Sequence, residues 1–335
     1  AGGGARDLDL EGLTQAQVTR IVYDSLEASK LKPQVSAQIE RKAPTPRDLR
    51  QICLLTNPES DPTAFLASKS WHDQVREGQK IAHDKRIIFA GLWRQIGATA
   101  AQEIFNVLTA FGSFFRDYQL IMLENDSKDD TVVGITRSCA DVDRAWCFTL
   151  KGLGKEVLHA GTQNRIVGLT ALRQTLLMKV LEFDSTGIFD YVMMVDADIY
   201  AQGNGGFDIG SALAAFSLPS RIQADAVCAF QIQSRTASLY DTFAHRGPEC
   251  KYADLDGSTT CPAESCGGGL VFYSLPAIRS SKCHYTYVNE QTCEHIPFNQ
   301  CLARHGHGKI FLFKPWAVAM AGEHGSRSDW SCTLL

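Results

Sequence analysis

The chain has 335 residues, of which 44% are hydrophobic and 21% are charged, and its formal net charge at pH 7 is −4. This length gives room for one large globular domain or two ordinary ones. The slight negative charge and the lack of a long basic block argue against a nucleic-acid partner, and the sequence contains no apolar run of 18 residues that would span a bilayer.

Residues 1–80 differ in pattern from the rest of the chain. The segment LTQAQVTRIVYDSLEASKL (13–31) has apolar residues at helical spacing and predicts a helix, and Pro46 is placed to begin a second, short helix. We therefore expect a helical stem or cap over 1–80, without catalytic residues, and a second domain over 81–335.

Strands and helices alternate from residue 85 onward. The expected strands lie at 87–90 and in YQLIMLENDSKDDT (118–131), DRAWCFTL (143–150), DYVMMVDADIY (190–200), DAVCAFQIQS (225–234) and GGGLVFYS (267–274). The expected helices are ATAAQEIFNVLTAFGSFF (98–115) and the amphipathic NRIVGLTALRQTLLMKVLEF (164–183). This alternation predicts an α/β fold with a mostly parallel sheet covered by helices on both faces, which binds ligands at the carboxyl ends of its strands.

Two aspartates follow the apolar run YVMMV and precede a glycine-rich segment. If the chain stays extended there, Asp196 and Asp198 point the same way and present two carboxylates at the ligand edge. Hard divalent cations such as Mn²⁺ and Mg²⁺ bind such oxygen ligands and keep positions for substrate phosphates. A solvated pair of acids in a turn is the alternative, and we favour the metal site.

A second acidic segment, LENDSKDDT (123–131), ends another predicted strand. Glu124, Asn125 and Asp126 offer acceptors to a base or a ribose, while a turn that only caps the next helix explains the same residues equally well. Asn125 also begins a glycosylation acceptor pattern, but a position at the ligand edge argues against modification.

The order of RIIFAGLWRQ, ENDSKDDT, NRIVGLTALRQTLL and FDYVMMVDADIY resembles the GT-A class of nucleotide-sugar glycosyltransferases. It is most similar to the fungal capsule-associated and Golgi-type mannosyltransferases. The resemblance covers the architecture of residues 85–330 and is most specific in ENDS and VDADI. Arg173-Gln174 stands where those families have Arg-Asn, and the cysteine-rich last third matches no particular subfamily.

The resemblance implies a GT-A (Rossmann-like) catalytic domain over 81–335 and roles for residues already named. Asp198, with Asp196 directly or through a metal-bound water, would hold Mn²⁺ or Mg²⁺ on the diphosphate of a sugar nucleotide. The remaining donor-binding residues that it implies are Glu124 and Asp126 near the ribose or base, and Arg165 and Arg173 toward the nucleotide or sugar. A solvated helix face is the alternative for both arginines.

Three later segments complete the expected site. The floor of the sugar pocket would be formed by Gly267, Gly268 and Gly269, and a tight turn or bulge is the alternative for these glycines. Glu294, at the start of a predicted helix, would be the general base of an inverting enzyme, whereas a retaining enzyme needs none. The alternative for Glu294 is a carboxylate stabilised by the helix dipole.

A late histidine often completes the metal shell in GT-A enzymes. His324, between Gly322 and Gly325, fits that place, and His305 and His307 are its competitors.

These assignments predict a metal-dependent enzyme that moves a hexose from a nucleoside diphosphate sugar to a hydroxyl of a glycan, protein or lipid. GDP-mannose is the favoured donor on resemblance, and UDP-sugars stay open. A nucleotidyltransferase is one alternative, but the expected phosphate loop, AGLWRQIGATA, holds only Gly91 and Gly97. A non-catalytic carbohydrate-binding protein on the same fold is the other.

Eleven cysteines are many for a cytosolic enzyme, and seven of them fall between Cys250 and Cys332. No C-x-x-C pair occurs, so we expect disulfides rather than a structural zinc site, with at least one thiol left over. This predicts the lumen of the Golgi or endoplasmic reticulum, or secretion. The opening AGGGARDLDLEG lacks the features of a signal peptide, and a membrane anchor outside these residues is left open.

Overall fold

The computed structural model describes residues 14–28, 51–55, 69–151, 163–197, 208–233, 238–239, 242–250, 259–267, 269–319 and 330–334. Three of the predicted site residues, Asp198, Gly268 and His324, lie outside these ranges, as does the short helix expected at Pro46.

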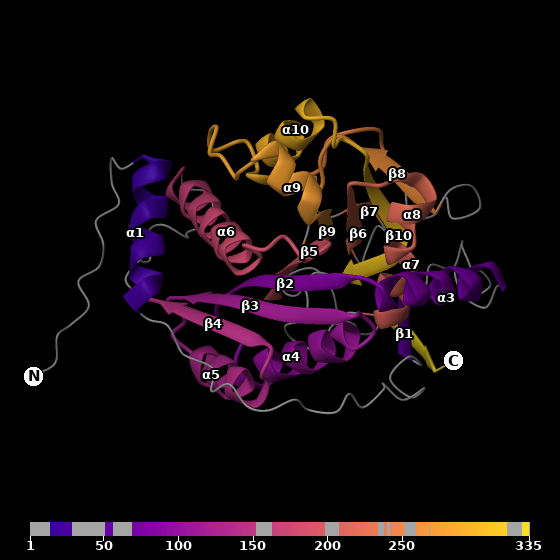
Figure 1. Ribbon diagram of the computed structural model, residues 1–335, viewed down its shortest axis with the longest axis horizontal. Helices are drawn as coiled ribbons and strands as arrows, with labels where there is room; N and C mark the ends of the chain where they lie inside the picture. Colours follow the sequence, from indigo (N-terminus) through magenta and orange to yellow (C-terminus); the bar gives the residue numbers. More distant parts are fainter. Residues whose placement is uncertain are drawn as a thin grey trace, which may run out of the picture.

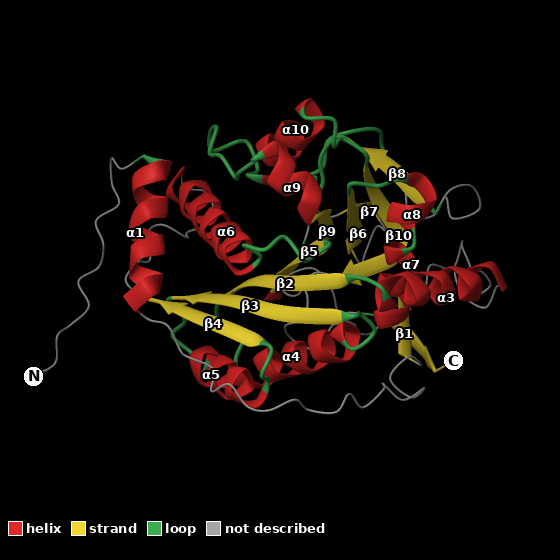
Figure 2. Cartoon of the chain, viewed as in Figure 1, coloured by secondary structure: helices red, strands yellow, loops and turns green. Residues whose placement is uncertain are grey.

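A nine-stranded sheet forms the centre of the molecule (Figures 1 and 2), with the strand order β4-β3-β2-β5-β9-β6-β10-β8 and with β7 paired to β6. Its strands are β2 (Arg86–Trp93), β3 (Asp117–Asn125), β4 (Ala145–Leu150), β5 (Tyr191–Asp196), β6 (Ala226–Gln233), β7 (Ser238–Leu239), β8 (Thr260–Ala263), β9 (Leu270–Ser274) and β10 (Ile310–Ala319). β4, β3, β2 and β5 are mutually parallel, β6 is parallel to β10, and β9 runs antiparallel between β5 and β6. The predicted α/β fold with a mixed, mostly parallel sheet is confirmed.

Helices cover both faces of this sheet. On one face lie α3 (Lys69–His83), α4 (Ala98–Gly112), α5 (Thr131–Asp141), α7 (Ile209–Phe216) and α8 (Leu218–Ile222). On the other face lie α1 (Gln15–Ala28), α6 (Gln163–Phe183), α9 (Leu275–Ser281) and α10 (His295–Arg304). Figure 1 shows α4 and α5 below the β4-β3-β2 half of the sheet and α6 above it.

The central strands are buried on both sides because the two helical layers enclose them. On β5, Met193 and Val195 enter the core shared with α4 and α7, whereas Val192 and Met194 enter the core shared with α6. This alternation follows from the two-residue period of a strand. It explains why these strands read as continuous apolar runs instead of alternating ones.

Helix α6 is buried over more of its surface than the predicted amphipathic pattern requires. Its buried residues include Thr170, Arg173, Thr175 and Lys179 in addition to the apolar ones. Part of this burial comes from α1, which packs on α6 through Val18, Val22 and Leu26 in the same core, and the Lys179 ammonium lies 4.1 Å from the centroid of the Tyr23 ring of α1. A face that reads as solvated in the sequence is therefore covered in part by another helix.

Two helices from the first 83 residues thus pack onto the central sheet. α1 contributes Val22 to one core, and α3, which runs across the expected boundary at residue 80, contributes Trp71 to the other. The division into 1–80 and 81–335 stays a prediction. A further connection was not predicted: β1 (Gln51–Leu55) pairs antiparallel with β11 (Trp330–Leu334) in a separate two-stranded sheet.

Four disulfides connect described cysteines, as expected from the sequence. They are Cys139–Cys147, Cys228–Cys266, Cys250–Cys261 and Cys283–Cys301. Cys283 and Cys301 lie beside His305, but their sulfurs are bonded to one another and so are not thiolate ligands for a metal.

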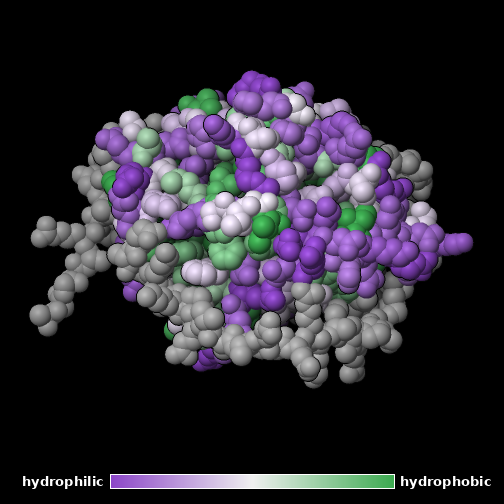
Figure 3. All heavy atoms as spheres, in the orientation of Figure 1, coloured by the Kyte–Doolittle hydropathy of each residue, from purple (hydrophilic) through white to green (hydrophobic). Residues whose placement is uncertain are grey.

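The surface described by the structure is largely polar. Its exposed large hydrophobic residues come from separate segments: Val133, Ile188, Ile222, Phe243 and Val288. Hydrophilic residues cover much of the face seen in Figure 3. None of the helices within the described ranges has the length and apolar character needed to cross a bilayer.

Candidate functional site

The carboxyl ends of β3 and β5 meet at one edge of the sheet, as predicted. Asp196, the last residue of β5, aligns with Leu92 of β2, and Leu92 aligns in turn with Leu123 of β3. β2 lies between the other two strands, so Glu124 and Asp196 are about 10 Å apart across the sheet. The prediction that Asp196 and Asp198 point the same way requires an extended chain through both residues. β5 is extended up to Asp196, and Asp198 lies outside the described residues, so this prediction is not tested.

Asp196 points toward α6 because it continues the series Val192, Met194, Asp196 on one face of the strand. There it meets Arg173, which is 8% exposed. Arg173 Nη1 donates to Asp196 Oδ1 at 2.9 Å and Nη2 donates to Oδ2 at 2.7 Å. This is a two-point contact, in which the planar guanidinium fixes the plane of the carboxylate.

The same guanidinium contacts a second carboxylate. Arg173 Nε donates to Glu294 Oε1 at 2.6 Å. Glu294 is 3% exposed and directly precedes α10, and the Cys293 thiol lies 3.5 Å from Glu294 Oε2. One arginine from α6 therefore joins the end of β5 to the start of α10. All three charged residues are predicted site residues, but their positions in the sequence did not indicate that they pair.

Burial and charge act in opposite directions on this network. Burial raises the pKa of Glu294, but the charge of Arg173 and its hydrogen bond outweigh burial and bring that pKa to about 2. Burial lowers the pKa of Arg173, and the charges of Asp196 and Glu294 raise it well above its usual value. Arg173 and Glu294 are consequently both ionised at neutral pH.

The residues around Glu294 form a closely packed layer. Burial, followed by the charge of Arg173, lowers the pKa of His295 to about 4, so its ring is neutral at pH 7. The His295 ring lies edge-on to Tyr285, and Tyr285 stacks on Phe298 of α10 with 4.4 Å between ring centroids. Tyr285 was not predicted, because its segment, CHYTYVNE, has no periodic pattern that would place it next to Glu294.

The glycine-rich segment contacts this layer. A Cβ on Gly267 would lie 2.4 Å from Cδ2 of His295, so the ring uses the space that a side chain would need. Gly269 has φ of 76°, and its carbonyl accepts a hydrogen bond from Asp196 N at 2.7 Å. The two described glycines thus support Asp196 and His295, and their contact with a sugar stays a prediction.

Side chains in and just after the end of β3 form hydrogen bonds with other groups of the protein. Glu124 is 1% exposed, its Oε1 accepts a hydrogen bond from Ser127 N at 2.7 Å, and burial raises its pKa. Asp126 follows with φ of 50°. The turn interpretation that the sequence left open therefore describes Glu124 in this structure. Asn125 is buried, and its amide nitrogen has no partner among the described residues.

The loop between β2 and α4 also bonds to this segment. Backbone N–H groups of Gln95, Ile96, Gly97 and Ala98 donate to side-chain oxygens in residues 127–131. Short acidic and hydroxyl side chains accept such bonds readily. These contacts were not predicted, although the short acidic and hydroxyl side chains of DSKDDT are typical acceptors for backbone N–H groups.

The other predicted residues lie apart from the network or outside the described ranges. Arg165 is half-buried near the start of α6, two turns before Arg173. His305 and His307 lie at the far end of α10, about 15 Å along the helix from Glu294. His305 Nδ1 lies 3.0 Å from the Cys301 carbonyl oxygen, and His307 Nε2 lies 3.0 Å from Ser280 Oγ. Neither histidine joins Asp196 in a metal site.

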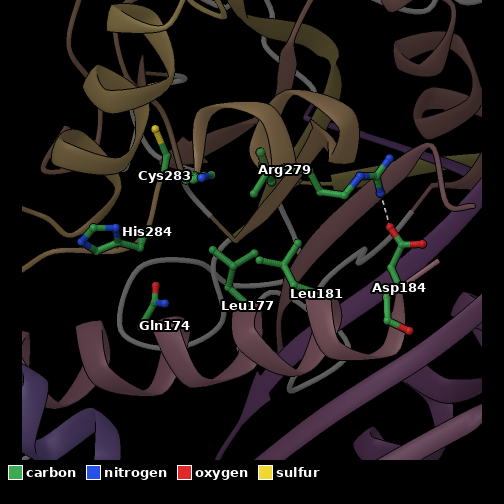
Figure 4. Close-up of a pocket in the computed structure, with 10 residues that line it drawn as sticks. Gln174, Leu177, Leu181, Asp184, Arg279, Cys283 and His284 are labelled. Carbon is green, nitrogen blue, oxygen red and sulfur yellow. Dashed lines mark hydrogen bonds and ion pairs between the residues drawn. The ribbon is translucent and has the colours of Figure 1, made fainter. Parts of the chain in front are cut away.

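A cavity of about 540 Å³ lies on another side of α6 (Figure 4). Leu177 and Leu181 of α6 face it together with Ile278 of α9, and the ion pair between Arg279 and Asp184 closes one end. Consecutive helical residues point about 100° apart, so Gln174 lines this cavity while Arg173 points into the carboxylate network. The cavity is separate from that network.

No protein-family model matches the chain, and no curated protein sequence matches it. Among solved structures, it is similar to the mannosyltransferase PcManGT from Pyrobaculum calidifontis in complex with GDP-Man and Mn²⁺, with a TM-score of 0.43 and 10% identity over 78% of this chain and 66% of that chain. It is also similar to mannosyl-3-phosphoglycerate synthase from Rubrobacter xylanophilus, with a TM-score of 0.40 and 11% identity over 75% of this chain and 71% of that chain. The chain spans just under two thirds of the length of PcManGT. At TM-scores below 0.5, these two likenesses do not identify a function for the chain.

Proposed function

We propose that the protein is a metal-dependent glycosyltransferase with a GT-A domain, which moves a hexose from a nucleoside diphosphate sugar to an acceptor hydroxyl. The observation that carries the proposal is Asp196, held at the carboxyl edge of a mostly parallel sheet by the buried Arg173. GDP-mannose is the favoured donor because ENDS and VDADI resemble mannosyltransferase segments, and UDP-sugars stay open.

The residues present fit a divalent cation. A carboxylate offers about four lone-pair positions, and the two N–H bonds from Arg173 use two of them at Asp196. The remaining positions, with Asp198 two residues on and His324 as the proposed late ligand, would hold Mn²⁺ or Mg²⁺. When bound, the metal supplies positive charge that stabilises the departing diphosphate.

The chain's own residues would bind and orient the donor. Asn125 presents a buried amide nitrogen at the edge where the base or ribose would lie, and Glu124 shapes the turn beside it. We propose that Asp126 and Arg165 contact the nucleotide, as the resemblance implies. Gly267, Gly268 and Gly269 would lie under the sugar.

Glu294 admits two roles. A general base has to be ionised, and Glu294 is, but its Oε1 is bonded to Arg173 and a pKa of about 2 makes it a weak proton acceptor. These contacts favour a positioning role for Glu294, and with it a retaining transfer, which needs no such base. The stereochemistry of the product, determined by NMR, separates the two roles.

The loop after β2 favours a glycosyltransferase over a nucleotidyltransferase. A phosphate-binding loop presents free backbone N–H groups to its ligand. Here the N–H groups of residues 95–98 are bonded to side chains in residues 127–131. The loop therefore has few donors left for a triphosphate.

The compartment is proposed from the disulfides. Four disulfides among the described residues suit an oxidising environment, so we propose the lumen of the secretory pathway or secretion. The acceptor would be a glycan, a protein or a lipid, and a membrane would be involved only through an anchor outside these residues.

A thermal-shift panel tests the proposal with GDP, UDP, CDP and their sugars, each with and without Mn²⁺. A ligand that binds the native state raises the melting temperature by mass action. We expect a Mn²⁺-dependent shift with GDP or GDP-mannose, followed by release of GDP when acceptor glycans are added. The absence of a shift with every nucleotide, in folded protein, would refute the proposal.

The same panel separates the alternatives. A nucleotidyltransferase would release pyrophosphate from a nucleoside triphosphate and a sugar 1-phosphate. A carbohydrate-binding protein would respond to sugars without nucleotide and without metal.

A further inference from the structure

The link between Asp196 and Glu294 through Arg173 has a consequence for the metal, on the premise of the function proposed above. We propose that Arg173 is a positioning residue that makes Asp196 and Glu294 one electrostatic unit, so that the charge on Glu294 controls how strongly the Asp196 side of the site holds Mn²⁺. Glu294 acts in this unit without touching the metal.

The first step is the orientation of Asp196. Arg173 donates one N–H to each oxygen of Asp196, at 2.9 and 2.7 Å, which fixes the carboxylate plane and occupies the side that faces α6. A cation has to approach from the side away from the guanidinium. Arg173 therefore determines where the metal sits relative to the sheet edge.

The second step is the attachment of Arg173 itself. Its Nε donates to Glu294 Oε1 at 2.6 Å, and the side chains of Arg173 and Glu294 are 10% and 4% exposed. Water screens such a buried pair weakly, so a change at one partner is felt at the other. Glu294 thereby holds Arg173 in the geometry in which it orients Asp196.

The third step is the balance of charge. Two carboxylates share one guanidinium, which leaves the unit with one net negative charge for a cation. Without the Glu294 charge, Arg173 neutralises Asp196 alone and opposes the metal. Without Arg173, both carboxylates attract the metal, but the plane of Asp196 is no longer fixed.

Four variants test this proposal: Glu294→Gln, Arg173→Gln, Arg173→Lys and the double variant Arg173→Gln/Glu294→Gln. The first readout is a titration of each protein with MnCl₂, in which free Mn²⁺ is followed by electron paramagnetic resonance. The second readout is kcat and KM for sugar transfer. Circular dichroism verifies that each variant is folded.

We expect the Mn²⁺ affinities of the variants to follow the net charge of Arg173, Asp196 and Glu294, and not the loss of thermal stability in each variant. Glu294→Gln should weaken Mn²⁺ binding about tenfold, and Arg173→Gln should strengthen it, although both lower kcat. The double variant carries the same net charge as the wild type, so its Mn²⁺ affinity should return to within about threefold of the wild-type value. Its kcat should stay as low as that of Arg173→Gln, because Asp196 is still not oriented.

Arg173→Lys separates charge from geometry and keeps the test valid if Arg173→Gln does not fold. Lysine preserves the positive charge but lacks the planar fork that contacts both carboxylates. We expect Mn²⁺ affinity close to that of the wild type and a reduced kcat with little change in the KM for the donor.

The possible results lead to different conclusions. If wild-type protein binds no Mn²⁺ and transfers no sugar, the proposed function fails and this inference fails with it. If the wild type binds Mn²⁺ and transfers sugar, but Glu294→Gln leaves Mn²⁺ affinity unchanged, only this inference is overturned. It is also overturned if all variants lose Mn²⁺ affinity in proportion to their loss of thermal stability.

Discussion

The backbone of Gly267 lies against the imidazole ring of His295, so closely that a methyl group on Gly267 would be 2.4 Å from Cδ2 and 2.5 Å from Cγ of the ring. His295 is the first residue of α10 and directly follows Glu294, the carboxylate that Arg173 contacts. The position of the glycine-rich segment is therefore tied to the position of Glu294. This contact also explains why a glycine is needed there.

Gly267→Ala should destabilise the protein by about 1–3 kcal/mol, the usual cost of overpacking a core, and should lower sugar transfer. His295 is 3% exposed, so its ring is enclosed by the protein and cannot move out into solvent without opening this packing. Urea denaturation measures the change in stability. Gly210→Ala in α7 is the matched control, because its Cβ would meet nothing closer than 3.6 Å, and it should be neutral or slightly stabilising. Equal effects of the two substitutions would contradict the packing argument.

His295 should make stability depend on pH between about 6.5 and about 4. Its pKa falls from 6.5 to about 4 on folding, chiefly through burial, so the unfolded chain binds more protons in this range. Stability is then fully present above pH 6.5 and decreases by up to about 3 kcal/mol as the pH falls to 4. Urea midpoints measured across this range should decrease for the wild type and decrease less for His295→Gln.

His83 provides the control for that measurement. Its side chain is 81% exposed at the end of α3, so His83→Gln should leave the pH dependence unchanged. If His295→Gln and wild type have the same slope between pH 6.5 and 4, His295 is not the group responsible.

Two disulfides should contribute to stability by different amounts. Cys228–Cys266 closes a span of 38 residues, whereas Cys139–Cys147 closes a span of 8 residues. Loop-closure entropy in the unfolded chain predicts losses of about 4 and about 2.5 kcal/mol when each pair is replaced by alanine. Denaturation of both double-alanine variants under non-reducing conditions measures this difference. Peptide mapping of unreduced protein should recover both linkages, and an unlinked pair would remove the basis of the prediction.

Asp198→Ala should abolish Mn²⁺-dependent transfer with little loss of stability, since the proposed role of Asp198 is to hold the metal. Transfer assays with and without Mn²⁺, together with thermal unfolding, test both parts. Asp141→Ala, at an exposed position at the end of α5, is the control and should retain activity. Unchanged transfer by Asp198→Ala would refute the metal role.

Much of the fold could be predicted from local patterns. The apolar runs that became β2, β3 and β5 are buried on both faces, so their composition alone indicates a parallel sheet between two helical layers. The second face of α6 was predicted less well. Its buried polar residues resemble a solvated face in the sequence, and only packing against distant segments makes them interior, as where Arg173 meets Asp196 and Glu294.

The pairing of β1 with β11 could not be predicted. Its partners are separated by most of the chain, as in the alignment of Cys53 with Cys332. Single-sequence patterns report periodicity over a few turns and carry no information about which distant strand supplies the hydrogen bonds.

The sequence by itself determined the chemistry that the site can offer. Carboxylates follow a buried strand at Asp196 and Asp198, an arginine lies on the preceding helix at Arg173, and an acid begins a later helix at Glu294. These identities follow from residue type and local spacing. The two aspartates predicted a divalent metal, the alternation of strands and helices predicted the α/β sheet, and the resemblance to GT-A enzymes implied the diphosphate.

Only the tertiary structure decided how those groups combine. Arg173 and Glu294 are 121 residues apart in sequence, yet 2.6 Å separates Nε from Oε1 once α6 and the start of α10 pack on the same face of the sheet. Arg173, which was predicted to bind the donor, therefore binds two carboxylates of the protein. The same contact brings the pKa of Glu294 to about 2. The physical reason is that electrostatic interactions depend on distance and burial in space, which chain order does not specify.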